Sequence, residues 1–346
     1  MFDSDPNNFY NPNHDNSSDG AFYPPSDFDM EISRKQSRIS ALKEIRYFGR
    51  IIGACMIAFV AMPYALVILA DKFNFLSLFT EEGNTGHCVN IILSISCYFL
   101  PFFIGYLVIQ KGRYPQDFPL GKPFSAKLTF YAAVSGLMLC YLSSFLSSYF
   151  VEMLEAMGME FPPAPFYEVP DTLLSFILCV IEIAVVPALS EEFIFRGVIM
   201  QPLRKFGDMY AILISSLLFS LAHGNIYQAP FSFLVGIVIG YAAVATGSMW
   251  TGILIHFLNN FSSVVFEYIY ETFPSYGNKA YFSFLAVIFV GGIATTVLFF
   301  FSKKARPVLR EQIYTGMGSM RKARVFFFTF PMLLSLTALV VNFLMY

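Results

Sequence analysis

The sequence contains few charged residues: Asp, Glu, Lys and Arg make up only 13% of its 346 residues. Soluble globular proteins usually contain about 25%, so this chain has too little polar surface to coat a water-soluble body of its size. Apolar residues make up 56% of the chain, and 41 residues are Phe. The net charge of −2 gives no basic surface for nucleic acid. The composition therefore argues against a soluble enzyme, a disordered scaffold and a nucleic-acid-binding protein.

Several common motifs of hydrolases and metalloproteins are also absent. The sequence has no Gly-x-Ser-x-Gly and no His-Glu-x-x-His. No pair among its five cysteines has Cys-x-x-Cys spacing, and four of the five lie in apolar runs. We therefore expect the cysteines to be small apolar residues in helices rather than a metal cluster or a disulfide framework.

The N-terminal region is polar and changes sign along its length. Residues 1–33 contain seven acidic residues and no Lys or Arg, which predicts a disordered acidic tail and no signal peptide. Residues 34–50 then contain six Lys and Arg. We interpret residues 34–47 as a basic juxtamembrane segment that lies on anionic lipid.

Residues 48–346 consist mainly of apolar runs that are long enough to cross a bilayer. About 20 apolar residues in a helix span roughly 30 Å of hydrocarbon, and backbone groups in lipid must be satisfied within the segment. The pattern predicts an all-α polytopic transmembrane helix bundle. Eight or nine spans fit equally well, near 48–70, 88–110, 128–150, 171–195, 209–229, 230–247, 249–270, 281–302 and 325–346.

The basic residues predict the orientation of these spans. With the N-terminus in the cytosol, four internal segments contain 20 of the 22 Lys and Arg. The external loops contain only Lys72 and Lys279. This distribution follows the positive-inside rule, so we expect a multi-pass protein of the plasma membrane with a cytosolic N-terminus and the lipid bilayer as its surroundings.

Ionisable residues within apolar spans are functional candidates, because they are costly in lipid. They form separate groups: Glu191, Glu192 and Arg196; His223; His256 with Asn259 and Asn260; and Glu182 and Glu267, to which we assign no role. Residues four apart share a helix face, which pairs Glu192 with Arg196 and His256 with Asn260. By the same spacing, Phe219 is expected to pack against the ring of His223.

This set of side chains is suited to amide hydrolysis. A buried carboxylate can act as a general base, a neutral imidazole can orient a water molecule or bind a metal, and an Asn amide can stabilise an oxyanion. Each residue also has a structural interpretation. Intramembrane His and Asn often bridge helices, and the Glu192–Arg196 pair is expected to be structural.

The three polar groups resemble the motifs of a known family. The motifs read Glu191-Glu192-Phe-Ile-Phe-Arg196, Phe219-Ser-Leu-Ala-His223 and His256-Phe-Leu-Asn259-Asn260. Their order is similar to that of the CPBP (Abi) family, the CAAX prenyl endopeptidase and bacteriocin-processing group of intramembrane proteases. The resemblance covers about residues 171–270, which we take as the catalytic core.

The resemblance implies a role for each motif residue. Glu191 and His223 would activate the attacking water, and His256 and Asn260 would hold the oxyanion. Glu192, Arg196, Phe219 and Asn259 would be supporting residues. Members of the family have been described both as metalloproteases and as metal-independent glutamate proteases. Glu191, His223 and His256 could ligate Zn²⁺ or another divalent metal, and the sequence leaves both mechanisms open.

The prediction is therefore an intramembrane endopeptidase that cleaves near the cytosolic leaflet. Its substrate is a peptide or protein: a prenylated protein, a bacteriocin leader or a signalling propeptide. Two alternatives are a non-catalytic membrane immunity or scaffold protein of the same fold and a proton-coupled transporter. We also expect Pro187, one turn before Glu191, to kink its helix and open a cavity.

Overall fold

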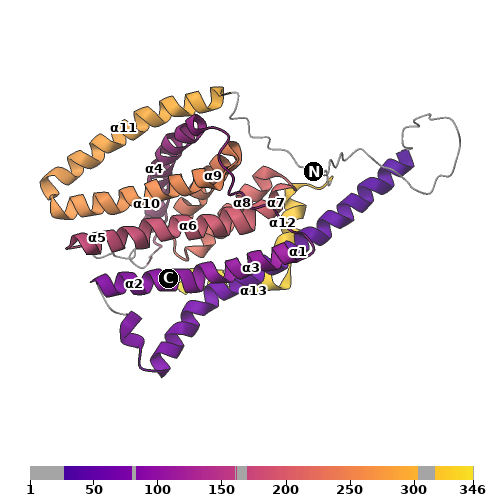
Figure 1. Ribbon diagram of the computed structural model, residues 1–346, viewed down its shortest axis with the longest axis horizontal. Helices are drawn as coiled ribbons and strands as arrows, with labels where there is room; N and C mark the ends of the chain where they lie inside the picture. Colours follow the sequence, from indigo (N-terminus) through magenta and orange to yellow (C-terminus); the bar gives the residue numbers. More distant parts are fainter. Residues whose placement is uncertain (1–26, 80–82, 160, 162–169, 303–315, 346) are drawn as a thin grey trace.

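The computed structural model describes residues 27–79, 83–159, 161, 170–302 and 316–345, and these residues fold as helices joined by short connections (Figure 1). No strand occurs in the part of the chain that the structure describes. The prediction of an all-α polytopic membrane bundle is thus confirmed.

Six helical stretches are long and apolar enough to span a membrane, within the residues described. They are α1 (Asp27–Lys72), α2 to α3 (Gly83–Lys111), α4 (Ala126–Ala156), α5 to α7 (Leu173–Arg204), α9 (Ala229–Thr246) and α11 (Pro274–Phe301). A seventh is obtained if α12 (Ser319–Phe327) and α13 (Phe330–Met345), which are bent by 86° relative to each other, count as one span.

The described residues thus contain six or seven candidate spans, fewer than the eight or nine expected, although each predicted run does contain helix. Helix α8 (Asp208–Ala222) has 15 residues and is about 22 Å long, too short for a bilayer of roughly 30 Å. Helix α10 (Met249–Thr272) has 24 residues, but His256, Asn259 and Asn260 lower its mean hydropathy. Apolar length alone does not separate a span from a buried core helix.

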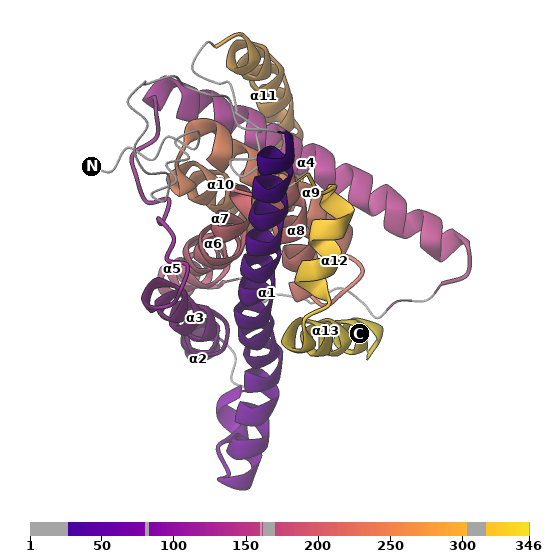
Figure 2. The same ribbon diagram turned by 90° about the vertical axis from the view of Figure 1, so that its right-hand side faces the viewer.

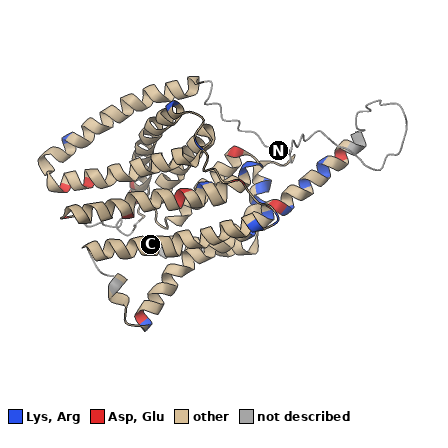
Figure 3. Ribbon diagram, viewed as in Figure 1, with Lys and Arg blue, Asp and Glu red and all other residues tan. Residues whose placement is uncertain are grey.

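The described part of the N-terminal region is helical. Helix α1 begins at Asp27, so residues 27–33 of the predicted tail belong to it, whereas residues 1–26 lie outside the described part. The basic segment 34–47 lies on the same helix, and Figure 3 shows its Lys and Arg residues along the N-terminal half of α1. Residues 303–315 of the last basic loop also lie outside the described part. The orientation of the bundle stays a prediction.

The stretch that carries Glu191 alternates between α-helical and π-helical turns. Two π-helical segments, Ile181–Val185 and Phe193–Met200, flank α6 (Val186–Glu192). Proline follows each of them, as Pro187 and Pro202. A proline lacks the N–H that the helix needs, and wider turns are common at such irregularities and at functional sites. The irregularity expected at Pro187 thus takes the form of π turns on both sides of Glu191.

Helix α1 packs closely on the C-terminal helices because glycine lets their backbones approach. Figure 2 shows α12 and α13 beside α1, although they lie at opposite ends of the sequence. A Cβ atom added at Gly53 would lie 2.7 Å from the carbonyl carbon of Pro331, and closer still to the backbone of Met332. Small residues have this function at many helix contacts in membranes.

Gly53→Ala is expected to lower the thermal unfolding midpoint in detergent. The new methyl group meets backbone atoms that cannot rotate away, and overpacking of this kind costs about 1–3 kcal/mol. Gly121→Ala is the matched control, because a Cβ atom there has no neighbour within 4 Å. Equal midpoints for the two variants would contradict this description of the α1–α13 contact.

Candidate functional site

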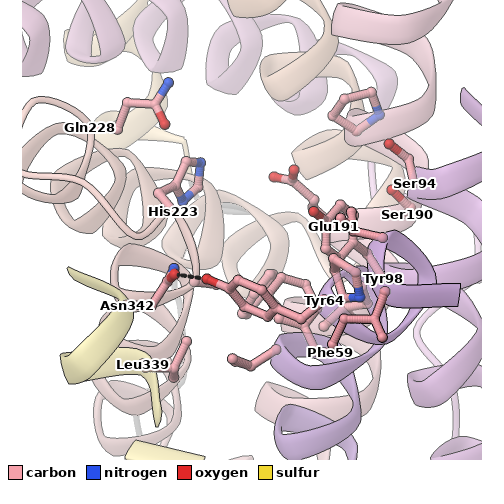
Figure 4. Close-up of a pocket in the computed structure, with 18 residues that line it drawn as sticks. Phe59, Tyr64, Ser94, Tyr98, Ser190, Glu191, His223, Gln228, Leu339 and Asn342 are labelled. Carbon is pink, nitrogen blue, oxygen red and sulfur yellow. Dashed lines mark hydrogen bonds between the residues drawn. The ribbon is translucent and has the colours of Figure 1, made fainter. Parts of the chain in front are cut away.

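Glu191 opens onto a pocket that α1, α6 and α13 line together with the end of α8. It lies near the end of α6, and its side chain is 30% exposed. The pocket has a volume of about 740 Å³ and is also lined by His223. Figure 4 shows the carboxylate of Glu191 and the ring of His223 facing each other across it. Glu191 Oε2 is buried and has no hydrogen-bond partner among the described residues. The rest of the carboxylate faces the pocket (Figure 4) and can accept a proton from a molecule there.

His223 caps the C-terminal end of α8. Its Nδ1 donates a hydrogen bond to the carbonyl oxygen of Phe219 at 2.8 Å, which leaves Nε2 as the acceptor of a neutral ring. The Phe219 ring meets the His223 ring edge to face, at 4.8 Å between centroids, as the spacing predicts. These two contacts fix the orientation of the imidazole toward the pocket.

The loop after His223 is held by its own side chains. Gly224 adopts φ +70°, and the Asn225 side chain hydrogen-bonds both the backbone and the side chain of Gln228. Tyr227 donates to Glu155 at 3.2 Å, and desolvation together with this carboxylate raises the pKa of Tyr227. The loop thereby gives His223 a fixed position at the pocket.

A buried chain of charged groups holds His256. Its Nδ1 lies 3.0 Å from Glu192 Oε1, and Arg196 Nε lies 3.1 Å from Glu192 Oε2. Arg196 also donates to the Gly236 carbonyl oxygen at 3.2 Å and lies over the Phe219 ring at 4.9 Å. The predicted Glu192–Arg196 contact is present, and the contact of Glu192 with His256 is one that helical spacing could not predict.

This chain directs the other ring nitrogen of His256 at Glu191. His256 Nε2 lies 3.7 Å from Glu191 Oε2, whereas His256 itself does not line the pocket. Glu191 and Glu192 are consecutive residues and point to different faces of their helix, yet both carboxylates approach the imidazole of His256. Glu192 orients the ring from the buried side, and Glu191 lies between the ring and the pocket.

The structure places Asn260 away from the pocket. Its Nδ2 donates to the Ile183 carbonyl oxygen at 3.0 Å, and its Oδ1 accepts from Asn259 Nδ2 at 3.0 Å. Ile183 lies four residues before Pro187, which has no N–H to donate to that oxygen. In this arrangement Asn260 provides the hydrogen bond that the proline cannot. Neither Asn259 nor Asn260 lines the pocket.

The predicted metal ligands do not form a metal site. Among the residues described, no three His, Cys, Asp or Glu side chains come together so that they could hold a metal ion. His223 lies across the pocket from Glu191 (Figure 4). Glu191, His223 and His256 in this geometry therefore do not fit Zn²⁺, and no step below depends on a metal.

A further polar cluster involves Glu182, to which the sequence assigned no role. Glu182 Oε2 lies 2.5 Å from His87 Nδ1, and Glu182 Oε1 accepts from Asn90 Nδ2 at 2.8 Å. His87 lies on α2, which begins at Gly83. The spacing of three residues between His87 and Asn90 was the available signal. Glu267 is exposed on α10.

Comparison with known proteins identifies the region that carries these residues. Residues 173–262 match a family model described as type II CAAX prenyl endopeptidase Rce1-like. The chain contains an Rce1-like domain of the CPBP family. Glu191, His223, His256 and Asn260 all lie within this Rce1-like domain, whereas α1, α4, α11 and α13 lie outside it.

A distant homologue supports the same assignment to the CPBP family. Membrane-embedded CAAX protease MroQ of Staphylococcus aureus (strain USA300) is 33% identical over 92 residues. The aligned region covers 25% of this chain and 37% of MroQ, so the chain matches little more than a third of its relative's length. No solved structure matches the chain.

Proposed function

We propose that the protein is a CAAX-type intramembrane endopeptidase that hydrolyses a peptide bond in the pocket at Glu191. The observation that carries this proposal is the pair Glu191 and His223, whose carboxylate and imidazole face each other across one pocket in an apolar bundle (Figure 4). The similarity of residues 173–262 to the Rce1-like endopeptidase family supports a peptidase, and therefore a peptide substrate.

Glu191 acts as the general base in this proposal. A water molecule between Glu191 and His223 Nε2 attacks the carbonyl carbon of the peptide bond, and its proton passes to the Glu191 carboxylate. The tetrahedral intermediate then collapses, and Glu191 returns the proton to the nitrogen of the leaving amine. The products are a carboxylic acid and an amine, so neither an oxidant nor a covalent nucleophile is needed.

His256 is proposed to stabilise the oxyanion. The Glu192–Arg196 chain holds its ring in place, and Nε2 donates to the intermediate when the ring is protonated. Asn260 does not line the pocket, so its amide can contribute a second donor only if it moves from its position at the Ile183 carbonyl oxygen. The proposed role of Asn260 thus requires a rearrangement near Pro187 when substrate binds.

His256→Ala is expected to lower kcat about 10²- to 10³-fold with little change in KM, because an oxyanion donor acts mainly in the transition state. Asn260→Ala is expected to have a smaller effect than His256→Ala, since its amide starts from another partner. Steady-state kinetics of the purified variants measure both effects. A His256→Ala change confined to KM would contradict the oxyanion role.

The proposed function is tested with protein reconstituted in liposomes and a panel of synthetic peptides. The panel contains farnesylated and unmodified peptides ending in Cys-a-a-X, bacteriocin-leader sequences and signalling propeptides, and mass spectrometry locates any cleavage site. We expect Glu191-dependent cleavage of at least one class. Lack of cleavage across the panel, in protein that is folded, would favour the alternative of a non-catalytic protein of the same fold.

The direction in which the pocket faces is part of the proposal. We infer that the N-terminus lies in the cytosol at the plasma membrane, because 20 of the 22 Lys and Arg lie in segments that this orientation places inside. Protease treatment of right-side-out vesicles should then leave an N-terminal epitope tag intact. Removal of the tag by the protease would show that the N-terminus lies outside the cytosol and would contradict this orientation.

A further inference from the structure

The pocket at Glu191 has two walls of different origin. One wall comes from α6, the π turn after it and α8, all within the Rce1-like domain. The opposite wall comes from α1, from the π-helical segment Ser94–Phe99 that precedes α3, and from α13. The match to the Rce1-like domain does not extend to these three elements. Residues with no motif of their own therefore shape the space in front of Glu191 and His223.

A hydrogen bond joins the two terminal helices in this second wall. Tyr64 Oη on α1 donates to Asn342 Oδ1 on α13 at 2.5 Å, across 278 positions of sequence (Figure 4). Tyr64 is 44% exposed, so its ring stands at the edge of the pocket. Pro63, which also lines the pocket, precedes Tyr64 and interrupts the backbone hydrogen bonds of α1 at this level.

Asn342 also reaches the loop that follows His223. A Cβ atom added at Gly224 would lie 2.7 Å from Asn342 Nδ2, and Gly224 directly follows His223. The Tyr64–Asn342 pair therefore lies between α1 and the loop that positions His223. Any group bound beside His223 must fit next to this pair.

The lining of the pocket indicates which chemistry fits there. Among the described residues that line the pocket, Glu191 is the only acidic one, and none is Lys or Arg. The wall around the Tyr64–Asn342 pair is apolar, with Phe59, Val60, Val67, Ile68 and Leu339. A charged side chain would lose its hydration without a partner, so an uncharged apolar side chain is the group that this wall accepts.

We propose that the hydrogen-bonded pair Tyr64–Asn342 is a size-selecting wall. It limits the bulk of the apolar side chain that a peptide can place beside Glu191 and His223. This proposal rests on the proposed function for its substrate. The volume of about 740 Å³ is typical of a ligand pocket and leaves room for several peptide residues, so the position of the wall sets the limit.

The test uses thiol labelling, which needs no catalytic activity. Ser190 lines the pocket next to Glu191, and Ser190→Cys places a reporter there. Cys88→Ser removes the exposed native cysteine, and the other four are buried. The labelling rates with small N-ethylmaleimide and bulky fluorescein maleimide are measured on the full-length protein in detergent, and their ratio reports the size limit.

Tyr64→Ala is expected to raise the ratio of bulky to small labelling about tenfold. Tyr64→Phe and Asn342→Ala, which remove the hydrogen bond and keep the ring of Tyr64, should each raise it about two- to threefold, within the range of one net hydrogen bond. Tyr149→Ala is the matched control, because Tyr149 is 71% exposed on α4 and does not line the pocket. It should leave the ratio unchanged.

An unchanged ratio in Tyr64→Ala would overturn the size-selecting wall. If that variant does not fold, unchanged ratios in Tyr64→Phe and Asn342→Ala would overturn it instead. The labelling ratio alone decides this proposal, whereas Glu191-dependent cleavage alone decides the proposed function. The failure of one is therefore distinguishable from the failure of the other.

Discussion

Glu191→Gln is expected to lower kcat/KM for peptide cleavage about 10²- to 10⁴-fold. The substitution keeps the shape and burial of the side chain but removes the basic oxygen that accepts a proton from water, and general-base catalysis contributes about 10²- to 10⁴-fold. In the structure this carboxylate has a buried oxygen without a hydrogen-bond partner. Cleavage of the peptide panel by reconstituted protein measures the effect.

Glu267→Gln is the matched control for this prediction. It makes the same chemical change on α10, but Glu267 is exposed and does not line the pocket. We expect its kcat/KM to stay within about twofold of the unsubstituted protein, as for surface substitutions in general. A Glu191→Gln variant that cleaves as fast as Glu267→Gln would remove Glu191 from the mechanism.

Arg196→Met is expected to destabilise the protein by about 3–5 kcal/mol. Arg196 and Glu192 are both buried and 3.1 Å apart, and removal of one partner leaves the other as an uncompensated buried charge. The thermal midpoint in detergent should fall, and the ring of His256 should lose its orientation with Glu192. The matched control is Arg204→Met. Its partner Asp208 is 2.8 Å away and is also buried, but Arg204 itself is partly exposed to solvent, so the expected loss is smaller than for Arg196→Met.

The double variant Glu192→Gln/Arg196→Met separates charge from packing. If the loss in Arg196→Met comes from the unpaired carboxylate, neutralising Glu192 as well should recover part of the stability. Equal midpoints for the single and the double variant would contradict a charge effect. Because Glu192 also holds His256, the recovered protein is still expected to be a poor enzyme.

The sequence predicted the parts of the protein that depend on local spacing. Apolar runs located the helices, since lipid permits little else, and the spacing of four residues placed Glu192 beside Arg196. The order of the three motifs located the Rce1-like domain. Spacing also predicted the contact of Phe219 with His223, because both residues lie on one helix face.

Contacts between distant segments were not predictable in this way. Glu192 reaches His256 across 64 positions and Glu182 reaches His87 across 95, and no periodicity links such residues. The sequence predicted more spans than the six or seven candidates among the described residues because α8 has the composition of a span but only 15 residues. Asn260 donates a hydrogen bond to the Ile183 carbonyl oxygen. This contact depends on how α10 packs against the π-helical segment before Pro187, and the spacing of residues along the chain does not reveal it.

The Tyr64–Asn342 pair shows the same limit at the pocket itself. Both residues lie in helices whose sequences have no motif, and only folding brings the two ends of the chain together. Sequence reasoning therefore found one wall of the pocket and missed the other. The reason is physical. Peptide hydrolysis needs particular side chains, which form recognisable motifs, whereas residues that only shape the pocket need a suitable volume and leave no motif.

Peptide cleavage in ¹⁸O-labelled water most directly tests whether the pocket at Glu191 hydrolyses a peptide bond. Liposomes containing the protein are incubated with the peptide panel, and the products are weighed by mass spectrometry. We predict that the new carboxyl group carries one ¹⁸O atom and that Glu191→Gln yields no labelled product. Cleavage without incorporated ¹⁸O, or equal labelled product from Glu191→Gln, would contradict a water molecule activated by Glu191.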